Sequence, residues 1–439
     1  MKKLSLWFLA LLFAGLAAFV QAAEPPRALT PDDIYAIKSV GDPHLSPDGR
    51  YVAFTVRAFQ RKEDNSDTDI YMVPTAGGEA LRLTGSPKAE TTPRFSPDGR
   101  YLAFLSGREG KKSQVWLLPR VGGEAFQLTQ FKSDVQELAW SPDGKRLALV
   151  VGDIDPDDPD TADDSPAATA AKDKEKKDEP AKAPKPIVIR RRQFKRDTEG
   201  YLREVRNHLY VFDVATKASE QITSGPYDET SPVWSPDGQQ IAFVSNRTAD
   251  PDANQNTDIF VVAAKAGAAP RDVSAAMQGS DEGPTWSPDG KQIAFVAGGD
   301  PKDMWYGPSA IAVVAVGAVD SGAPRLLTRE LDRNVREPRF TPDGKAILFL
   351  VEEGGNSHLA RVPVAAGGKV ERVVEGEREI ESFDVDAKGN IVLLASEPDL
   401  PAEIFAVKPG GAALDRLSHV NDAFLSGIRL GSVVRYKAK

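Results

Sequence analysis

Few residues in this chain of 439 could make or break covalent bonds, since it has no cysteine and only four histidines. A serine hydrolase of the α/β type needs its serine in a Gly-x-Ser-x-Gly turn. The nearest text, Gly355-Asn356-Ser357-His358, lacks the second glycine. His44, His208, His358 and His419 have neither a helical metal spacing nor the surroundings of a triad base. No glycine-rich loop could cradle a phosphate. We therefore predict no catalytic residue.

Two polar segments carry the oxygen ligands that cations use. Asp64-Asn65-Ser66-Asp67-Thr68-Asp69 gathers several such oxygens but lacks the central glycine and terminal glutamate of a calcium loop. Residues 250–258, which include Asn254 and Asn256, form the second segment. Both precede an expected strand, so we interpret them as polar loops at one end of the fold. We predict no metal and no cofactor.

Two further segments could contact a ligand. Met304-Trp305-Tyr306 falls in an expected loop, where large aromatic side chains could stack on a peptide or another domain, or tuck over a strand edge. We take Met304, Trp305 and Tyr306 as the candidate substrate-facing loop. Arg190-Arg191-Arg192 could bind an anion, although a solvated strand edge facing the acidic loop of residues 152–186 is the simpler interpretation.

An internal repeat supplies the elements that must position these residues. In its clearest form it reads Ser-Pro-Asp-Gly, a turn in which proline presets φ, aspartate bonds the local backbone and glycine takes the positive φ. The copies lie at residues 46–49, 96–99, 141–144, 235–238, 287–290, 341–344 (with threonine first) and, in degenerate form, 386–389. A fixed internal period of this kind decides the architecture.

Four short strands can be assigned to each copy. In the second copy they are expected at residues 92–95, 101–105, 114–118 and 125–129. Four antiparallel strands repeated about every 45–54 residues are typical of a propeller blade. We predict an all-β fold, a seven-bladed β-propeller of four-stranded antiparallel blades. A β-helix repeat is shorter, and a two-sheet sandwich has no reason to repeat its turn.

The rest of the chain divides around this propeller. Residues 1–22, with two early lysines, an apolar run and small residues at the end, predict a secretory signal peptide. Residues 23–41 hold a short helix that begins at Thr30-Pro31-Asp32-Asp33. The propeller is expected over residues 42–421. Within it, residues 152–186 are expected to be a disordered insertion because they contain almost no large apolar side chains.

Charge and cysteine usage narrow the partners and the compartment. The formal net charge is −9, which disfavours nucleic-acid binding. Without cysteine, an exported protein must rely on burial rather than disulfides for its stability. We predict a periplasmic or secreted protein with no nucleic-acid partner and no stable membrane anchor after removal of the leader.

Several longer strings resemble the propeller of the prolyl oligopeptidase family, in its acylaminoacyl-peptidase and secreted dipeptidyl-peptidase branch. They are residues 40–43, 245–252, 299–306 and 419–425. The Ser-Pro-Asp-Gly turn alone is less specific, because TolB-type periplasmic propellers share it. The resemblance implies a propeller that gates access of short peptides to an α/β-hydrolase domain, which follows it in the family and carries the catalytic serine, aspartate and histidine.

The sequence ends at Lys439, near the point where the family's chain crosses into the hydrolase domain. Residues 422–439 are therefore expected to begin a linker toward an absent hydrolase domain, and this chain alone is expected to be inactive. Residues 422–439 and the helix near Ile34 should then expose apolar surface. The alternative is a stand-alone TolB-type propeller that binds a protein or peptide, for which both segments should be fully buried.

Overall fold

The computed structural model describes residues 25–108, 112–155, 188–197, 200–317, 322–408, 410–411 and 413–436. The predicted signal peptide and most of the predicted insertion lie outside these residues. Within the described residues, no helix is both long enough and apolar enough to cross a membrane.

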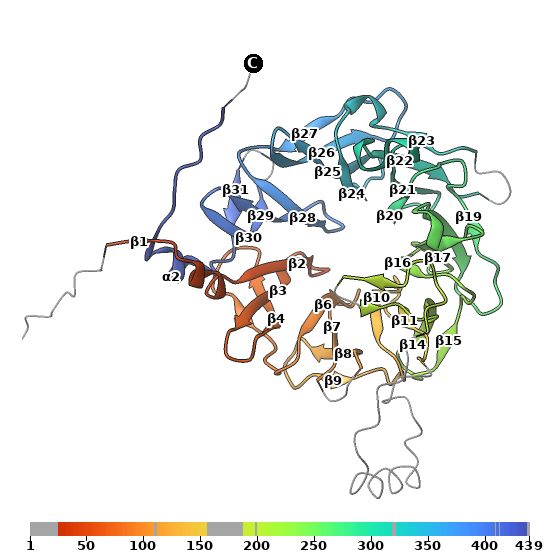
Figure 1. Cartoon of the computed structure of the whole chain (residues 1–439), viewed down its shortest axis with the longest axis horizontal. Coiled ribbons are helices and arrows are strands. Elements are labelled where there is room, and N and C mark those ends of the chain that lie inside the picture. Colours follow the sequence, from red (N-terminus) through yellow and green to blue (C-terminus); the bar gives the residue numbers. More distant parts are fainter. Residues whose placement is uncertain are drawn as a thin grey trace, which may run out of the picture.

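Figure 1 shows β-sheets that follow one another in sequence order around a ring, with the first strand of each sheet nearest the centre. In the described part of the chain, five sheets have four strands each. Their strands are β2 (Ser39–Leu45), β3 (Tyr51–Gln60), β4 (Asn65–Pro74) and β5 (Leu81–Arg82); β6 (Glu90–Phe95), β7 (Tyr101–Ser106), β8 (Gln114–Pro119) and β9 (Phe126–Gln127); β10 (Val135–Trp140), β11 (Arg146–Gly152), β14 (Asn207–Asp213) and β15 (Ser219–Gln221); β16 (Glu229–Trp234), β17 (Gln240–Ser245), β18 (Asp258–Ala263) and β19 (Arg271–Asp272); and β20 (Glu282–Trp286), β21 (Gln292–Ala297), β22 (Ala310–Ala315) and β23 (Arg325–Leu326).

The last part of the ring is one sheet of eight strands. It consists of β24 (Val335–Phe340), β25 (Ala346–Glu353), β26 (Asn356–Pro363), β27 (Glu371–Val374), β28 (Glu379–Val385), β29 (Ile391–Glu397), β30 (Leu400–Val407) and β31 (Leu414–Arg416). Two antiparallel four-stranded halves are joined by a single parallel pair, Ser357 with Glu379. The predicted all-β fold of four-stranded antiparallel units is therefore confirmed, but the hydrogen bonds do not give seven separate sheets.

Short elements accompany the ring. β1 (Arg27–Ala28) pairs in parallel with β32 (Ile428–Arg429), and β12 (Lys195–Arg196) pairs with β13 (Gly200–Tyr201). The helical turns are η1 (Pro31–Tyr35), η2 (Pro251–Ala253), η3 (Pro301–Tyr306), η4 (Arg329–Leu331) and α2 (Asp422–Leu425). The predicted helix after Thr30 forms as η1, a 3-10 helix with a capping box between Thr30 and Asp33.

Two strands of the ring extend across the predicted domain boundaries. The first strand of the ring begins at Ser39, before the predicted start at residue 42, because Val40 is buried and pairs with Val56. The second strand of the third sheet runs to Gly152, the first residue of the predicted insertion, because it continues its pairing with Asn207.

Each Ser-Pro-Asp-Gly turn is fixed by the same local hydrogen bonds. In the second copy, Ser96 Oγ donates to Asp98 Oδ1 at 2.6 Å, and the Tyr101 backbone N–H donates to Ser96 Oγ at 3.0 Å. Gly99 takes the positive φ, 68°, that the turn requires. Asp98 thereby holds the turn through bonds within the turn itself.

Successive turns also pack on one another around the ring. A Cβ placed on Gly290 would lie 3.5 Å from Cδ of Pro236, in the turn before it, and one on Gly344 would lie 3.4 Å from Cδ of Pro288. Tryptophans add a hydrogen bond between neighbouring sheets. For example, Trp286 Nε1 donates to the carbonyl oxygen of Val233 at 3.1 Å.

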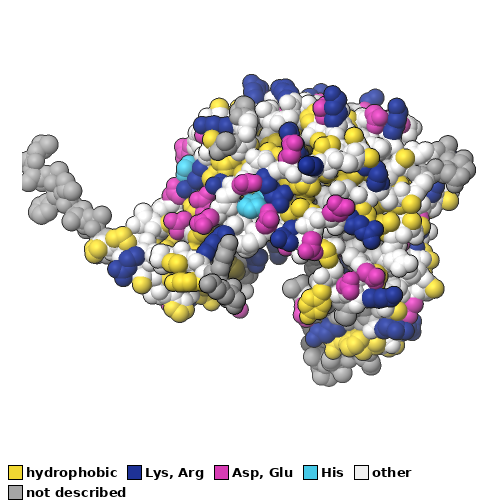
Figure 2. Space-filling model, turned by 90° about the horizontal axis from the view of Figure 1, so that it is seen from above, with side chains coloured by type: hydrophobic (Ala, Val, Ile, Leu, Met, Phe, Trp, Pro, Cys, Tyr) yellow, Lys and Arg dark blue, Asp and Glu magenta, His cyan; other side chains and the backbone are white. Residues whose placement is uncertain are grey.

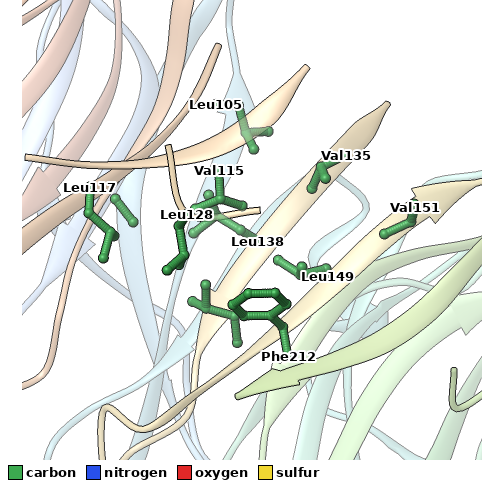
Figure 3. Packing of buried hydrophobic residues seen from close by; sticks show 11 residues of the cluster. Leu105, Val115, Leu117, Leu128, Val135, Leu138, Leu149, Val151 and Phe212 are labelled. Carbon is green, nitrogen blue, oxygen red and sulfur yellow. The ribbon is translucent and has the colours of Figure 1, made fainter. Parts of the chain in front are cut away.

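The hydrophobic core lies between neighbouring sheets rather than within one of them. One cluster combines Leu105 and Val115 of the second sheet with Leu149, Val151 and Phe212 of the third. Figure 3 shows these side chains meeting between the strands. Because both faces of a central strand are covered in this way, its sequence reads as a continuous apolar run.

The ring is closed by side chains. Among the described residues, no strand pairing joins the first sheet to β28–β31. Val52 and Phe54 pack instead with Leu394 and Ile404 in one buried cluster. The side chain of Asn421 accepts from the Lys38 backbone N–H and donates to the Lys38 carbonyl oxygen, both at 2.9 Å.

We expect Asn421→Ala to reduce the free energy of unfolding by about 2 to 3 kcal/mol, because it removes both hydrogen bonds and leaves the backbone groups of Lys38 unpaired. Asn421 is buried, with only 1% of its surface exposed. Urea unfolding followed by far-UV circular dichroism measures the change. Asn65→Ala, at an exposed position, is the control and should change stability by less than about 0.5 kcal/mol. Equal losses in the two variants would contradict closure through Asn421.

Candidate functional site

All the polar and aromatic segments singled out in the sequence lie at one face of the ring. In an antiparallel four-stranded meander, the turn after the second strand and the connection to the next sheet share one end, opposite the Ser-Pro-Asp-Gly turns. Residues 64–69, 190–192, 250–258 and 304–306 all fall after a second strand. We call this end of the ring the loop face. The segments occupy different sheets, so the structure brings them to one face but not into one cluster.

A hollow of about 300 Å³ opens at the loop face beside the third sheet. Its lining combines acids and bases from three connections: Asp134 precedes β10, Asp153 follows β11, and Arg206 precedes β14. Tyr201 of β13, about half exposed, supplies an aromatic side chain and stacks on Phe194. The hollow is therefore polar, with charges of both signs around it.

Ion pairs fix the walls of this hollow. The Arg206 backbone N–H donates to Asp153 Oδ2 at 3.0 Å, and its guanidinium donates to Asp228 Oδ2 at 2.8 Å. Arg203 lies 3.0 Å from Asp155. Asp153 and Asp155 follow β11, whereas Asp228 lies between β15 and β16, so the ion pairs hold these two connections together while the acids keep part of their surface exposed.

A buried polar network lies behind this wall. His208 Nδ1 is 2.8 Å from Glu229 Oε2, and Arg247 donates to Glu229 Oε1 at 2.6 Å. Thr223 Oγ1 also donates to Glu229 Oε2, at 2.9 Å. The other nitrogen of His208, Nε2, lies 3.6 Å from Asp153 Oδ1, so the network reaches the hollow.

The network sets the protonation of His208. Burial opposes the charged imidazolium, yet the hydrogen bond and negative charge of Glu229, together with the charges of Asp153 and Asp228, raise the pKa of His208 above its ordinary value. Residues 208 and 229 are 21 positions apart, and sequence reasoning assigned His208 no role. One pattern in the sequence could have indicated the network. In two sheets an acid begins the first strand and an arginine stands two residues after the second strand: Glu90 with Arg108, and Glu229 with Arg247.

The arginine cluster is neutralised from within the chain. Arg191 donates to both carboxylate oxygens of Asp252, at 3.1 and 2.8 Å. Arg192 pairs with Asp250 and Arg190 with Glu204. The acids therefore come partly from the second polar segment predicted in the sequence. Among the described residues, no group of three or more metal-ligating side chains could hold a metal ion.

The candidate substrate-facing residues lie at the loop face, in η3 rather than in an irregular loop. Asp300 caps this helical turn by accepting from the Lys302 backbone N–H. Tyr306 is 91% exposed. The side chains of Met304 and Trp305 are outside what the structure describes. That these residues face a substrate stays a prediction.

Apolar side chains near both ends of the described chain are exposed, as expected. Ile34 is 61% exposed in η1, and it lines a groove of about 440 Å³ with Tyr35 and Phe59. Val433 and Tyr436 are also exposed. Full burial, which the stand-alone alternative predicted, is not found.

Comparison with known proteins relates this chain to β-propellers and to peptidases. Residues 36–190 match the family model of the TolB beta propeller domain. Dipeptidyl-peptidase 5 of Porphyromonas gingivalis is 29% identical over 196 residues, which cover 44% of this chain and 27% of that protein. The chain spans only about a third or less of the length of the curated relatives that it matches first.

Solved structures agree on the fold. An acylaminoacyl peptidase of Pyrococcus horikoshii is similar with a TM-score of 0.66 and 16% identity, over 90% of this chain and 55% of that chain. The β-propeller domain of the trilobed protease of Pyrococcus furiosus gives a TM-score of 0.58 and 18% identity, over 88% of this chain and 99% of that chain. The predicted propeller fold and the predicted resemblance to peptidase propellers are confirmed.

We expect Asp153→Asn to lower the pKa of His208, because the substitution removes a carboxylate that favours the imidazolium. The folded-state pKa of His208 is raised. The contribution of His208 to stability is therefore complete below its unfolded-state pKa, near 6.5. This contribution is lost as the pH rises through the folded-state pKa. In the variant this loss should occur at lower pH. A ¹H–¹³C NMR titration of the histidine rings, assigned with His208→Gln, measures the pKa directly.

The matched control for this titration is Asp64→Asn, which removes an exposed carboxylate from the β3–β4 connection of another sheet. It should leave the pKa of His208 unchanged. An unaltered His208 titration in Asp153→Asn would contradict the proposed link between the buried network and the hollow.

Proposed function

We propose that this chain is the propeller half of an exported serine peptidase of the prolyl oligopeptidase family, in which the propeller admits short peptides and a following α/β-hydrolase domain cleaves them. The proposal rests on the similarity to peptidase propellers and on the short span of the peptidase relatives that the match covers. It also accounts for the sequence, which contains no nucleophile elbow. In this view the serine ester chemistry belongs entirely to the other domain.

The observation that carries the proposal is the asymmetry of the two faces. The Ser-Pro-Asp-Gly turns form one uniform end of the ring. The loop face has the polar hollow, and η1 and α2 enter and leave the ring there. Exposed Ile34, Tyr35 and Phe59 give this region an apolar character that a covering domain would bury. We infer that the hydrolase domain sits over the loop face.

The hollow beside the third sheet suits a short peptide. Its volume of about 300 Å³ is at the lower end of the range for small-ligand sites. Asp134 and Asp153 offer negative charge to an ammonium group, and the exposed Lys132, which also lines the hollow, offers positive charge to a carboxylate. A short peptide carries both end groups within a small length, whereas a folded protein does not present them together. The hollow would therefore favour small substrates.

Export is proposed from the first 22 residues, which have the composition of a cleavable leader. The periplasm or the exterior would suit a protein without cysteine. A nucleic-acid partner is disfavoured by the net negative charge, and acidic and basic side chains are interspersed on the surface in Figure 2.

A stand-alone binding propeller is the second candidate, favoured by the match of residues 36–190 to the TolB beta propeller domain. The exposed apolar side chains of η1 and of residues 433–436 weigh against it.

We expect the purified chain to release no p-nitroaniline from dipeptidyl or acyl-amino-acid substrates. A protein that includes the hydrolase domain should cleave these substrates and should lose this activity with a serine-directed reagent. It should leave a folded protein such as native albumin intact. Turnover by the purified chain alone would contradict the proposal that the hydrolase domain carries all of the catalysis. A reading frame that ends at Lys439, with a protein partner bound specifically, would favour the stand-alone propeller instead.

A further inference from the structure

The loop face repeats one charge pair in two sheets and breaks it in a third. Glu90 at the start of β6 lies 3.1 Å from Arg108, and Glu229 at the start of β16 lies 2.6 Å from Arg247. Each arginine comes two residues after the second strand of its sheet. In the β20–β23 sheet this position is Gly299, two residues after the end of β21.

The acid of the pair is nevertheless retained in that sheet. Glu282 pairs with Val296, so the preceding residue, Asp281, stands opposite Ala297 and takes the place of Glu90 and Glu229. Asp281 is completely buried, and neither of its carboxylate oxygens meets a donor in hydrogen-bond geometry. A buried carboxylate without a partner is costly when it is charged.

Two further aspartates surround Asp281. Asp258 of β18 is 6% exposed, and its Oδ1 also lacks a partner. Asp272 of β19 is the third member. The largest charge effects on Asp281 come from these two acids, and Asp272 has the largest charge effect on Asp258. We call Asp258, Asp272 and Asp281 the acid cluster.

Burial and mutual repulsion favour the neutral forms of these acids. Burial, reinforced by Asp258 and Asp272, raises the pKa of Asp281 to about 7, despite the nearby Ser274 hydroxyl and Gly298 amide. Burial and the charge of Asp272 raise the pKa of Asp258 to about 6. Burial also raises the pKa of Asp272. The other ionisable side chains on the adjoining elements are Arg271, Glu282, Asp300, Lys302, Asp303 and Tyr306.

Backbone packs directly on backbone where the segment after β21 meets the residues that precede Asp281. A Cβ on Gly279 would lie 2.5 Å from the Gly299 carbonyl oxygen, and one on Gly298 would lie 2.6 Å from the Ser280 nitrogen. A Cβ on Gly299 would lie 2.8 Å from the Gly307 carbonyl. The segment from Gly298 to Gly307, which contains η3, therefore rests directly on the chain that leads into Asp281.

We propose that the acid cluster is a proton-controlled latch for the segment 298–307: the segment stays docked while the carboxyl groups are neutral and lifts from the ring when they ionise. Ionised Asp281 needs water, and the glycine contacts leave water no access while the segment is docked. Lifting the segment hydrates the carboxylate and moves η3, with the exposed Tyr306, at the loop face. In the other two sheets an arginine lies within ion-pair distance of the acid, although the oxygens of Glu90 also lack a donor in hydrogen-bond geometry and burial raises the pKa of Glu90.

Hydrogen–deuterium exchange of the full chain tests the latch between pH 5.5 and 8.5, after correction for the intrinsic exchange rate. We expect the protection of peptides spanning 298–307 to fall at least tenfold across this range, while peptides from β7 and β17 keep their protection. Asp281→Asn should abolish the fall, because an amide stays neutral. Glu282→Gln, which changes the adjacent exposed residue, should behave like the unaltered chain.

A second variant keeps the test independent of how well Asp281→Asn folds. Asp258→Asn removes a neighbouring negative charge, so Asp281 should ionise more easily and the loss of protection should move to lower pH. Protection that is independent of pH in the unaltered chain, or unchanged pH dependence in Asp281→Asn, would overturn the proposal. Restored protection at pH 8 on addition of calcium chloride would also overturn it, because the cluster would then be a cation site.

Stability gives an independent readout with a defined sign. The folded-state pKa of Asp281 lies above the unfolded value near 3.9, so the contribution of Asp281 to stability is complete at low pH, is lost as pH rises from about 4 to about 7, and changes no further above that range. In urea unfolding, the free energy of unfolding of Asp281→Asn relative to that of the unaltered chain should be higher at pH 8 than at pH 5.5.

Discussion

Every sheet in this ring depends on its two neighbours, because no sheet can bury its own apolar faces. The largest fully buried side chains make this plain. Phe54, Phe104, Phe243, Phe295 and Phe349 each occupy the second strand of a four-stranded unit, in the middle of the wall between sheets. Burial of this kind stabilises a ring only if the ring is complete. The contact between the first and last units, made by packed side chains and the Asn421 amide, therefore matters more than its small size suggests.

The two faces of the ring differ in how much they contribute to the packing between neighbouring sheets. At the Ser-Pro-Asp-Gly face, four of the turns pack their glycine against the proline of the turn before it, namely Gly144, Gly238, Gly290 and Gly344, so this end tolerates little change. The loop face does not repeat one glycine contact from sheet to sheet in the described part of the chain; its close contacts of glycine with backbone are confined to the β20–β23 sheet. Connections there vary from the two-residue turn between β25 and β26 to the long segment between β11 and β14. Chemistry and recognition can vary at this face because the ring is fixed from the other side.

The repeat made the fold predictable, since a local turn with its own hydrogen bonds marks the same point in each unit. It could not predict that the last two units share a sheet, because that depends on one parallel contact between Ser357 and Glu379. Nor could it predict the partners of Arg191 or His208, which come from other connections and meet only when the ring forms. Pairing across loops depends on distance in space, and a turn motif contains no information about that distance.

The loop face also shows how one repeated template can give parts with different behaviour. Where an acid and an arginine face each other, as Glu229 and Arg247 do, the charge is satisfied in place and the surrounding connections are fixed around it. Where glycine replaces the arginine, as at Gly299, the backbone closes over the acid and the charge can be accommodated only by movement. The exchange of one residue type thus changes a rigid support into a responsive element, while the sheet beneath it keeps the same register and the same core.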